Sequence, residues 1–348
     1  MPAKTKILGI FAILIILLLM GAQCGLQSGE PAAPAAENVT VEATAEHEHA
    51  GEDHAHEAEA AAEFSPVSLA AGEKLKVVAA NSIVADMVKN VAGDLVELTF
   101  LIPLGSDPHS FQATPQDVAN VAEAHVFFAN GLGLEEFLSE LIENAGGKVV
   151  VVSLSTEIEE REGREGDEAY DHGSVDPHTW TTPANAIVFV HNIEQTLSAL
   201  DPANAETYQA NAEAYEAELA ELDAWVKSQI ETIPAENRQL VTDHAIFGYY
   251  ADRYGLEQIG AVIPSFSTAA ELSAQELAKL EDVIKEQGVK AIFIGNTVNP
   301  GLEQRVAEDT GIQLVTLYTE SLGPEGSGVE TYVDYIRYNT QAIVEALK

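Results

Sequence analysis

Short apolar, β-branched runs alternate with helical patterns from Lys74 to the C-terminus. Strands that alternate with helices predict βαβ units and a mostly parallel sheet. Four such runs lie in the first half of this segment and four in the second: Leu75–Ala80, Val96–Ile102, Ala124–Ala129, Lys148–Leu154, Gln239–Thr242, Gln258–Ile263, Lys290–Ile294 and Gln313–Tyr318. The pattern therefore predicts an α/β protein with two lobes, each built around its own sheet.

The two halves also resemble each other in how one helix begins. Thr114 is followed three residues later by Asp117, and Ser273 is followed three residues later by Glu276. A hydroxyl and a carboxylate at this spacing form a capping box, which satisfies free N–H groups at a helix start. In both halves the helix then leads to a buried strand. We infer two similar lobes.

A long amphipathic pattern separates the halves. Asp201 and Pro202 are typical of a helix start, and Pro234 ends the pattern. Apolar residues recur at spacings of three and four, which places them on one helix face: Tyr208, Ala212, Tyr215, Leu219, Leu222, Val226 and Ile230. We expect one rigid linking helix over 201–234, about 45 Å long, between an N-terminal lobe over 72–200 and a C-terminal lobe over 235–348.

Residues 1–24 have the pattern of a secretory signal. Lys4 and Lys6 precede the uncharged apolar run Ile7–Met20, which is shorter than a membrane-spanning helix. Cys24 is the only cysteine of the chain, so an internal disulfide is excluded. Its position after the apolar run resembles a bacterial lipid-attachment site, and the alternatives are an ordinary cleaved signal or an uncleaved anchor. All three place the chain outside the cytoplasmic membrane, in the periplasm or on the membrane's outer face.

Residues 25–71 form a low-complexity tether rich in Ala, Glu and Pro, which contains too little apolar surface to fold. Four histidines lie among its carboxylates: His47, His49, His54 and His56. Flexible His/Glu ligands bind transition metals loosely, so we interpret this tract as an auxiliary, weak metal-collecting segment. The alternative is a solvated acidic linker.

The net charge of −39 for 348 residues limits the partners of the chain. Phosphates would be repelled, which excludes nucleic acid. The same charge suits a protein that meets cations, and we expect it to act as a monomer.

Three histidines stand in short polar motifs beyond predicted strands. His109 and His178 each end an Asp-Pro-His sequence, and His244 follows Asp243 directly after a strand. Glu320 ends the last apolar run. Ligands in open α/β sheets gather at the carboxyl ends of strands. Three imidazoles and one carboxylate there would complete a tetrahedral shell that suits Zn²⁺, with each lobe supplying two ligands.

A metal-bound imidazole needs a partner for its second nitrogen. Asp107, Asp176 and Asp243 precede the three histidines by one or two residues, and could fill this role or order the loops. Other histidines fit the site less well. We expect structural roles for His125 and His191. His172, at the end of the acidic insertion Glu157–Asp171, is a candidate auxiliary ligand.

These motifs carry a resemblance over nearly the whole folded part. The segments Pro103–Gln116, Asp176–Pro183 and Asp243–Leu256 resemble the zinc/manganese-binding solute-binding proteins of bacterial ABC importers. The resemblance implies two α/β lobes bridged by a rigid helix, with a metal ion held between them and delivered to a membrane permease. It also implies His109, His178, His244 and Glu320 as ligands, although the family often has Asp where Glu320 stands.

The donor set favours one cargo and leaves others open. Manganese prefers more oxygen ligands than this set contains, so Zn²⁺ is favoured over Mn²⁺, while affinity alone does not exclude Cu²⁺ or Ni²⁺. Two other classes of protein remain as alternatives. A secreted zinc hydrolase would need an open metal position, which exists if Glu320 is not a ligand. A surface adhesin is the third possibility. We expect a carrier, not an enzyme.

Overall fold

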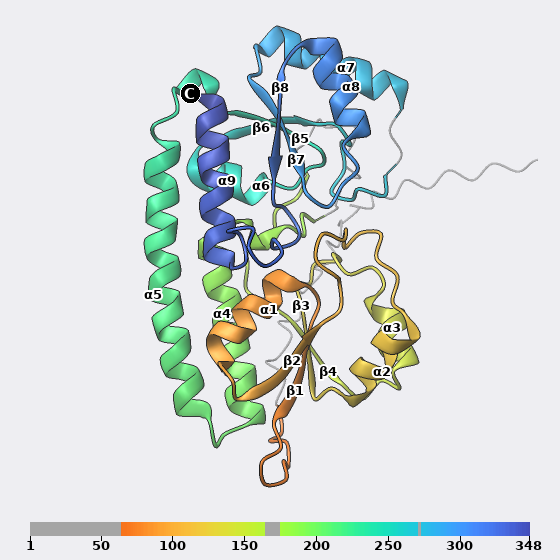
Figure 1. Cartoon of the computed structure of the whole chain (residues 1–348), viewed down its shortest axis with the longest axis vertical. Coiled ribbons are helices and arrows are strands. Elements are labelled where there is room, and N and C mark those ends of the chain that lie inside the picture. Colours follow the sequence, from red (N-terminus) through yellow and green to blue (C-terminus); the bar gives the residue numbers. More distant parts are fainter. Residues whose placement is uncertain (1–63, 164–174, 271–272) are drawn as a thin grey trace, which may run out of the picture. The chain divides into compact units, whose positions relative to one another are not determined.

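The computed structural model describes residues 64–163, 175–270 and 273–348, which all belong to one compact unit spanning Ala61–Lys348. Two four-stranded parallel sheets organise it, in the strand orders β2-β1-β3-β4 and β6-β5-β7-β8 (Figure 1). The strands of the first sheet are β1 (Leu75–Ala79), β2 (Val96–Phe100), β3 (Val126–Ala129) and β4 (Val150–Ser153). Those of the second are β5 (Gln239–Thr242), β6 (Glu257–Ala261), β7 (Ala291–Gly295) and β8 (Gln313–Leu317). All eight predicted strands are present, and both lobes have the predicted parallel pairing.

Helices connect the strands in the same order in both lobes. In the first lobe they are α1 (Ser82–Ala92), α2 (Pro115–Glu123), α3 (Leu138–Asn144) and α4 (Pro183–Leu200). In the second they are α6 (Gly248–Tyr254), α7 (Ala274–Gln287), α8 (Gly301–Thr310) and α9 (Tyr332–Leu347). The capping boxes of α2 and α7 both form as predicted. The internal repeat is therefore a structural one: each lobe is four consecutive strand–helix units.

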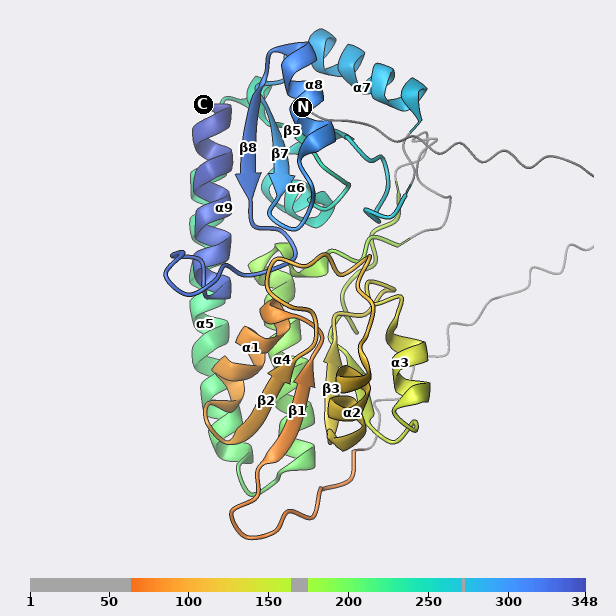
Figure 2. The same cartoon turned by 45° about the vertical axis from the view of Figure 1, so that its right-hand side comes forward.

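One helix of the described segments has no counterpart in this repeat. It is α5 (Ala205–Ile230), and it packs against α4 and α1 of the first lobe and against α9 and α6 of the second (Figures 1 and 2). The predicted apolar stripe, from Tyr208 to Ile230, is the buried face of this helix. That face joins one continuous hydrophobic core that contains residues of both lobes. The helix thus links the lobes through side-chain packing as well as through the chain.

The linking helix begins later than its start signals predict. Asp201 caps the end of α4, where its N–H donates to the carbonyl of Leu197, and the residue at the N-cap of α5 is Asn204. Its carboxylate instead accepts hydrogen bonds from Tyr208 and Asn204, at 2.9 and 2.7 Å. The reason is tertiary: α4 and α5 lie antiparallel, and the chain needs residues 201–204 to turn between them. The helix starts at Ala205.

The folded part begins before residue 72. The N–H of Val67 donates to the carbonyl of Leu200, and Phe64, Val67 and Leu69 pack against the main core. These apolar residues lie at the end of a segment whose average composition is polar. The signal, Cys24 and the four histidines of the tether lie outside the described residues. Along the part of the chain that the structure describes, no helix is both long and apolar enough to cross a membrane.

Candidate metal centre

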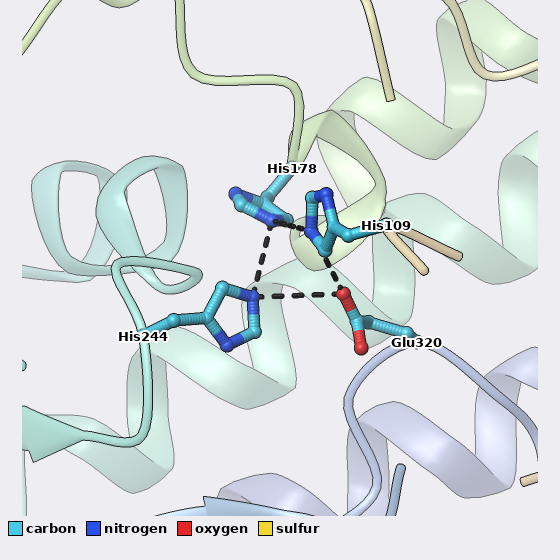
Figure 3. Close-up of side chains that lie close together, drawn as sticks. All are labelled: His109, His178, His244 and Glu320. Atoms are coloured by element: carbon cyan, nitrogen blue, oxygen red, sulfur yellow. Dashed lines mark hydrogen bonds and ion pairs between the residues drawn. The ribbon is translucent and has the colours of Figure 1, made fainter. Parts of the chain in front are cut away.

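Four side chains from four separate segments converge at one point (Figure 3). His109 lies in the loop after β2, and His178 precedes a short 3₁₀ turn, η1 (Thr179–Thr181). His244 follows β5, and Glu320 follows β8. All four are buried, and one donor atom of each lies within 4.8 Å of the other three. The structure therefore brings together the four residues that the sequence proposed as a shell, with two from each lobe.

The separations between the donor atoms have the size of a coordination shell. Nε2 of His178 lies 3.4 Å from Nε2 of His109 and 3.3 Å from Nε2 of His244. Oε1 of Glu320 lies 3.1 Å from Nε2 of His109 and 3.5 Å from Nε2 of His244. A tetrahedron has edges of roughly 1.6 times its centre-to-vertex length, so metal–nitrogen bonds of about 2.0–2.1 Å require edges of about 3.3 Å. Four of the six edges match this value.

The carboxylate of Glu320 presents a single oxygen to the centre. Its Oε2 accepts a hydrogen bond of 2.7 Å from the hydroxyl of Thr297. Its Oε1 is buried and faces Nε2 of His109 and of His244 without a well-directed hydrogen bond, so positive charge at the centre must compensate this carboxylate oxygen. A cation at the centre would supply this charge. The arrangement favours a carboxylate that binds through one oxygen.

Two of the three imidazoles are oriented by carboxylates. Nδ1 of His178 lies 2.8 Å from Oδ1 of Asp176, and Nδ1 of His244 lies 3.0 Å from Oδ1 of Asp243. A carboxylate at Nδ1 fixes the proton there and leaves the Nε2 lone pair free for an ion. Asp107 has the other role foreseen for it: it accepts the backbone N–H of His109 at 2.9 Å and orders the loop.

The electrostatics of the cluster favour positive charge at its centre. Burial lowers the pKa of His244, but the charges of Asp243 and Glu320 outweigh burial and raise the pKa to about 10. Burial likewise raises the pKa of Glu320, and the imidazoles of His109 and His244 more than reverse this and hold it well below its usual value. Burial dominates at His178, whose pKa is lowered. In the metal-free protein, a proton on His244 thus supplies the positive charge that a bound metal ion would supply.

The sequence patterns missed a link between the lobes beside His178. Arg161 donates from Nη1 to Oδ2 of Asp176 at 3.3 Å and from Nε to Asp252 of α6 at 2.7 Å. The hydroxyl of Tyr249 donates to the carbonyl of Asp176 at 3.2 Å. Arg161 stands at the start of the acidic insertion, and no spacing rule connects it to Asp176. The contact of Thr297 with Glu320 was also missed, because no spacing rule connects these two residues.

We expect Asp176→Asn to lower metal affinity about 10- to 100-fold. The amide would place an N–H₂ group against either Nδ1–H of His178 or the guanidinium of Arg161, so one of the two contacts is lost. The measurement is a competition titration with a chromophoric chelator. Asp252→Asn is the matched control, because Asp252 is exposed, contacts the same guanidinium of Arg161 and lies outside the four-residue cluster. Equal affinities for the two variants would show that Asp176 does not support the site.

The remaining described histidines have other contacts. Nδ1 of His125 accepts the backbone N–H of Lys76 at 2.8 Å, and His191 is exposed on α4 beside Gln195. Neither belongs to the four-residue cluster. His172 lies outside the described residues, so its role as an auxiliary ligand stays a prediction.

Two parallel α/β lobes, a linking helix packed on both and a buried His/carboxylate cluster between them define a metal-binding solute-binding protein. Residues 77–346 match the family described as the periplasmic zinc-uptake complex component A. The chain belongs to this family of ABC-importer components.

Similar proteins cover most of the chain. The manganese-binding lipoprotein MntA of Halalkalibacterium halodurans is 36% identical over 277 residues, which are 79% of this chain and 89% of MntA. The manganese ABC transporter substrate-binding lipoprotein PsaA of Streptococcus pneumoniae is 34% identical over 285 residues, 79% of this chain and 90% of PsaA. Among solved structures, the periplasmic zinc binding protein TroA of Treponema pallidum matches with a TM-score of 0.72 and 30% identity, covering 79% of this chain and 99% of TroA. The fold and the extracytoplasmic class predicted from the sequence are confirmed.

Proposed function

We propose that the chain captures one divalent transition metal ion with His109, His178, His244 and Glu320 and delivers it to the membrane permease of an ABC importer. One observation carries this proposal: four buried donor atoms face one another at separations of 3.1–3.5 Å along a closed ring (Figure 3). Without an ion, the buried carboxylate oxygen of Glu320 depends on a proton at His244 for compensation. An ion at the centre accounts for all four at once.

The donor set supports Zn²⁺ as the preferred cargo. Three imidazole nitrogens and one carboxylate oxygen are typical of tetrahedral zinc, whereas Mn²⁺ favours more oxygen ligands. The second oxygen of Glu320 is engaged by Thr297, which limits the oxygen donors further. Mn²⁺ is the alternative cargo, because MntA and PsaA are both named for manganese. The two ions make different demands on the same four residues, so a direct comparison measures which ion this shell itself prefers.

The test is a competition between the two ions on protein that has first been stripped of metal. We expect one tight site per chain, with Zn²⁺ bound at least about tenfold more tightly than Mn²⁺, as the order of divalent affinities at nitrogen-rich sites requires. Isothermal titration of each ion, followed by displacement of bound Mn²⁺ with Zn²⁺, measures the ratio. Tighter binding of Mn²⁺ would assign the cargo to manganese, and the absence of any tight site would remove the proposal.

The same geometry supports a carrier over a hydrolase. A catalytic zinc keeps one position for water, and it needs a nearby general base. Here Glu320 directs Oε1 into the fourth position, and the carboxylates of Asp176 and Asp243 are engaged by imidazoles and by other donors. Four protein ligands leave a tetrahedral ion no open position. Cys24 would tether such a carrier to the membrane by a lipid anchor, as a monomer beside its permease.

Metal affinity should rise with pH. His244 has a pKa of about 10 without metal, so it carries a proton at neutral pH that an incoming ion must displace. One displaced proton makes the affinity about tenfold weaker for each unit by which the pH falls below that pKa. Titration calorimetry in buffers of different ionisation enthalpy counts the protons released. Release of no proton at pH 7, with an affinity that is flat between pH 6 and 8, would contradict this assignment.

A further inference from the structure

A cavity of about 620 Å³ opens beside the four-residue cluster. Loops that follow β2, β6 and β7 line it together with the first turn of α8, so both lobes contribute walls. These loops lie at the carboxyl ends of strands, where ligands of parallel α/β sheets bind. Its polar lining includes Asp107, Gln112, Thr268, Thr297, Asn299 and Glu303. We call this space the outer cavity.

Two residues of the outer cavity contact the proposed metal ligands directly. Thr297 donates its hydroxyl to Oε2 of Glu320 at 2.7 Å. Asp107 accepts the backbone N–H of His109 at 2.9 Å, and its other oxygen accepts the hydroxyl of Thr268 across the lobes at 2.6 Å. The outer cavity therefore adjoins the metal centre through hydrogen-bonded neighbours.

One carboxylate in the lining of the outer cavity is incompletely satisfied. Glu303 is only 3% exposed, and its Oε2 has no hydrogen-bond partner. The backbone N–H groups of Leu302 and Glu303 at the start of α8 also interact with this carboxylate. Burial raises the pKa of Glu303, and the charge of Asp243 raises it further. An unpaired carboxylate oxygen in the interior is costly unless a proton or a cation reaches it.

The lining selects a cation with a preference for oxygen. Among the described residues, the side chains that line the outer cavity include carboxylates, hydroxyls and amides but no basic group. Such a wall repels anions, and hydroxyl and amide oxygens can accept hydrogen bonds from the water shell of an ion. A volume of this size holds an ion together with its first shell of water. A hydrated divalent cation fits this chemistry.

We propose that the outer cavity is a transient binding site, here called the station, for a hydrated divalent metal ion that moves to or from the four-residue inner cluster. The charge of Glu303 holds the ion there. This inference rests on the proposed function, because the ion is the cargo of the inner site. The charge of the buried Glu303 carboxylate attracts the ion electrostatically, and the hydroxyls and amides of the wall accept hydrogen bonds from its bound water. The ion then exchanges water for the imidazoles and Glu320.

A station on the path has a kinetic signature that a structural role lacks. Glu303 does not belong to the inner cluster, so removing its charge should leave the equilibrium affinity of that cluster unchanged. A group that stabilises the ion midway lowers the barrier for arrival and for departure alike. Loss of that group should therefore slow both rates by the same factor. A residue that only supports the fold would alter affinity or thermal stability instead.

The test is Glu303→Gln in the full chain, with Zn²⁺ as the probe and stopped-flow fluorescence as the readout. Trp180 reports on the inner site, since its ring lies 5.4 Å from the ring of His178 and its Nε1–H donates to the carbonyl of Thr319 at 3.0 Å. Glutamine retains an oxygen for the N–H groups of α8. We expect association and dissociation to slow together by about tenfold, at the lower end of what electrostatic focusing contributes to rates, with an unchanged Kd.

Glu308→Gln is the matched control, because Glu308 is exposed on the same helix and its substitution removes the same charge. Its rates should stay within about twofold of those of the unsubstituted chain, since exposed charges at a distance are screened. Unchanged rates in Glu303→Gln, or equal effects of the two substitutions, would overturn the station. So would a weaker Kd accompanied by a lower melting temperature, which would give Glu303 a structural role.

The same experiment separates this inference from the function on which it rests. If the unsubstituted chain binds no Zn²⁺ or Mn²⁺ tightly at equilibrium, the proposed function fails and the station fails with it. If the unsubstituted chain binds tightly and Glu303→Gln exchanges metal at the same rates, only the station fails. Equilibrium titrations and rate measurements on the same two proteins decide both questions.

Discussion

His178→Ala is expected to weaken Zn²⁺ binding by about 100- to 1000-fold. Binding to a four-ligand zinc site is worth about 10–16 kcal/mol, so one ligand contributes on the order of 3–4 kcal/mol. His178 occupies a corner of the ring with close contacts to both other imidazoles, at 3.4 and 3.3 Å. Its loss leaves three donors and a hole that water fills. A competition titration against a chelator of known affinity measures the change.

The fold should survive this substitution. His178 lies in a loop before η1, outside the helices and strands that form the main core, and its ring meets His109 and His244 as well as Trp180. Circular dichroism and the melting temperature of metal-free protein test this point. His191→Ala is the control, because His191 is an exposed histidine on α4. An affinity for His178→Ala equal to that of the control would remove His178 from the shell.

Glu320→Gln is expected to weaken metal binding on the order of a hundredfold and to change its selectivity. The substitution keeps the shape of the side chain and can keep the bond to Thr297, but it removes the charge that faces the ion. Mn²⁺ should lose more affinity than Zn²⁺, because manganese depends more on anionic oxygen. The ratio of the two dissociation constants, measured on the same preparation, is the decisive quantity.

The same variant should also bind metal with a weaker pH dependence. Glu320 is one of the two charges that raise the pKa of His244, so its loss lowers that pKa and the proton competes less with the ion. Thr297→Val provides the comparison, since it frees Oε2 of Glu320 while leaving the carboxylate charge in place. A Glu320→Gln protein with unchanged affinity and unchanged proton release would show that Glu320 lies near the ion without binding it.

Local patterns sufficed for the elements and indicated the four residues of the proposed site, which the structure brings together. Alternation of apolar runs with helical periodicity predicts all eight strands. The reason is that residues close together in sequence determine which face of a strand or a helix is apolar and therefore buried. The capping boxes of α2 and α7 are equally local, since each involves a hydroxyl and a carboxylate three residues apart. The start of α5 was misplaced because Asp201 has two compatible uses, and only the packing of α4 against α5 selects one.

The contacts around the site were beyond local patterns. Thr297 holds Glu320, and Arg161 connects Asp176 to α6 of the other lobe. These partners lie far apart in sequence, and their side chains are of types that are common on any surface. Which of many hydroxyls or guanidinium groups meets a given carboxylate depends on how the two lobes pack. No spacing between residues in the sequence indicates which of these groups contacts the carboxylate.

The sequence by itself determined the two-lobed α/β class, the Asp-Pro-His and Asp-His motifs, and the residue types of the centre. Only the tertiary structure decided that the four side chains meet, that Glu320 directs a single oxygen inward, and that Glu303 lies buried in the lining of the outer cavity. The physical reason is the range of the interactions. Capping and periodic burial act over a few residues, whereas a coordination shell needs donor atoms about 3 Å apart from segments that meet only when both lobes have folded.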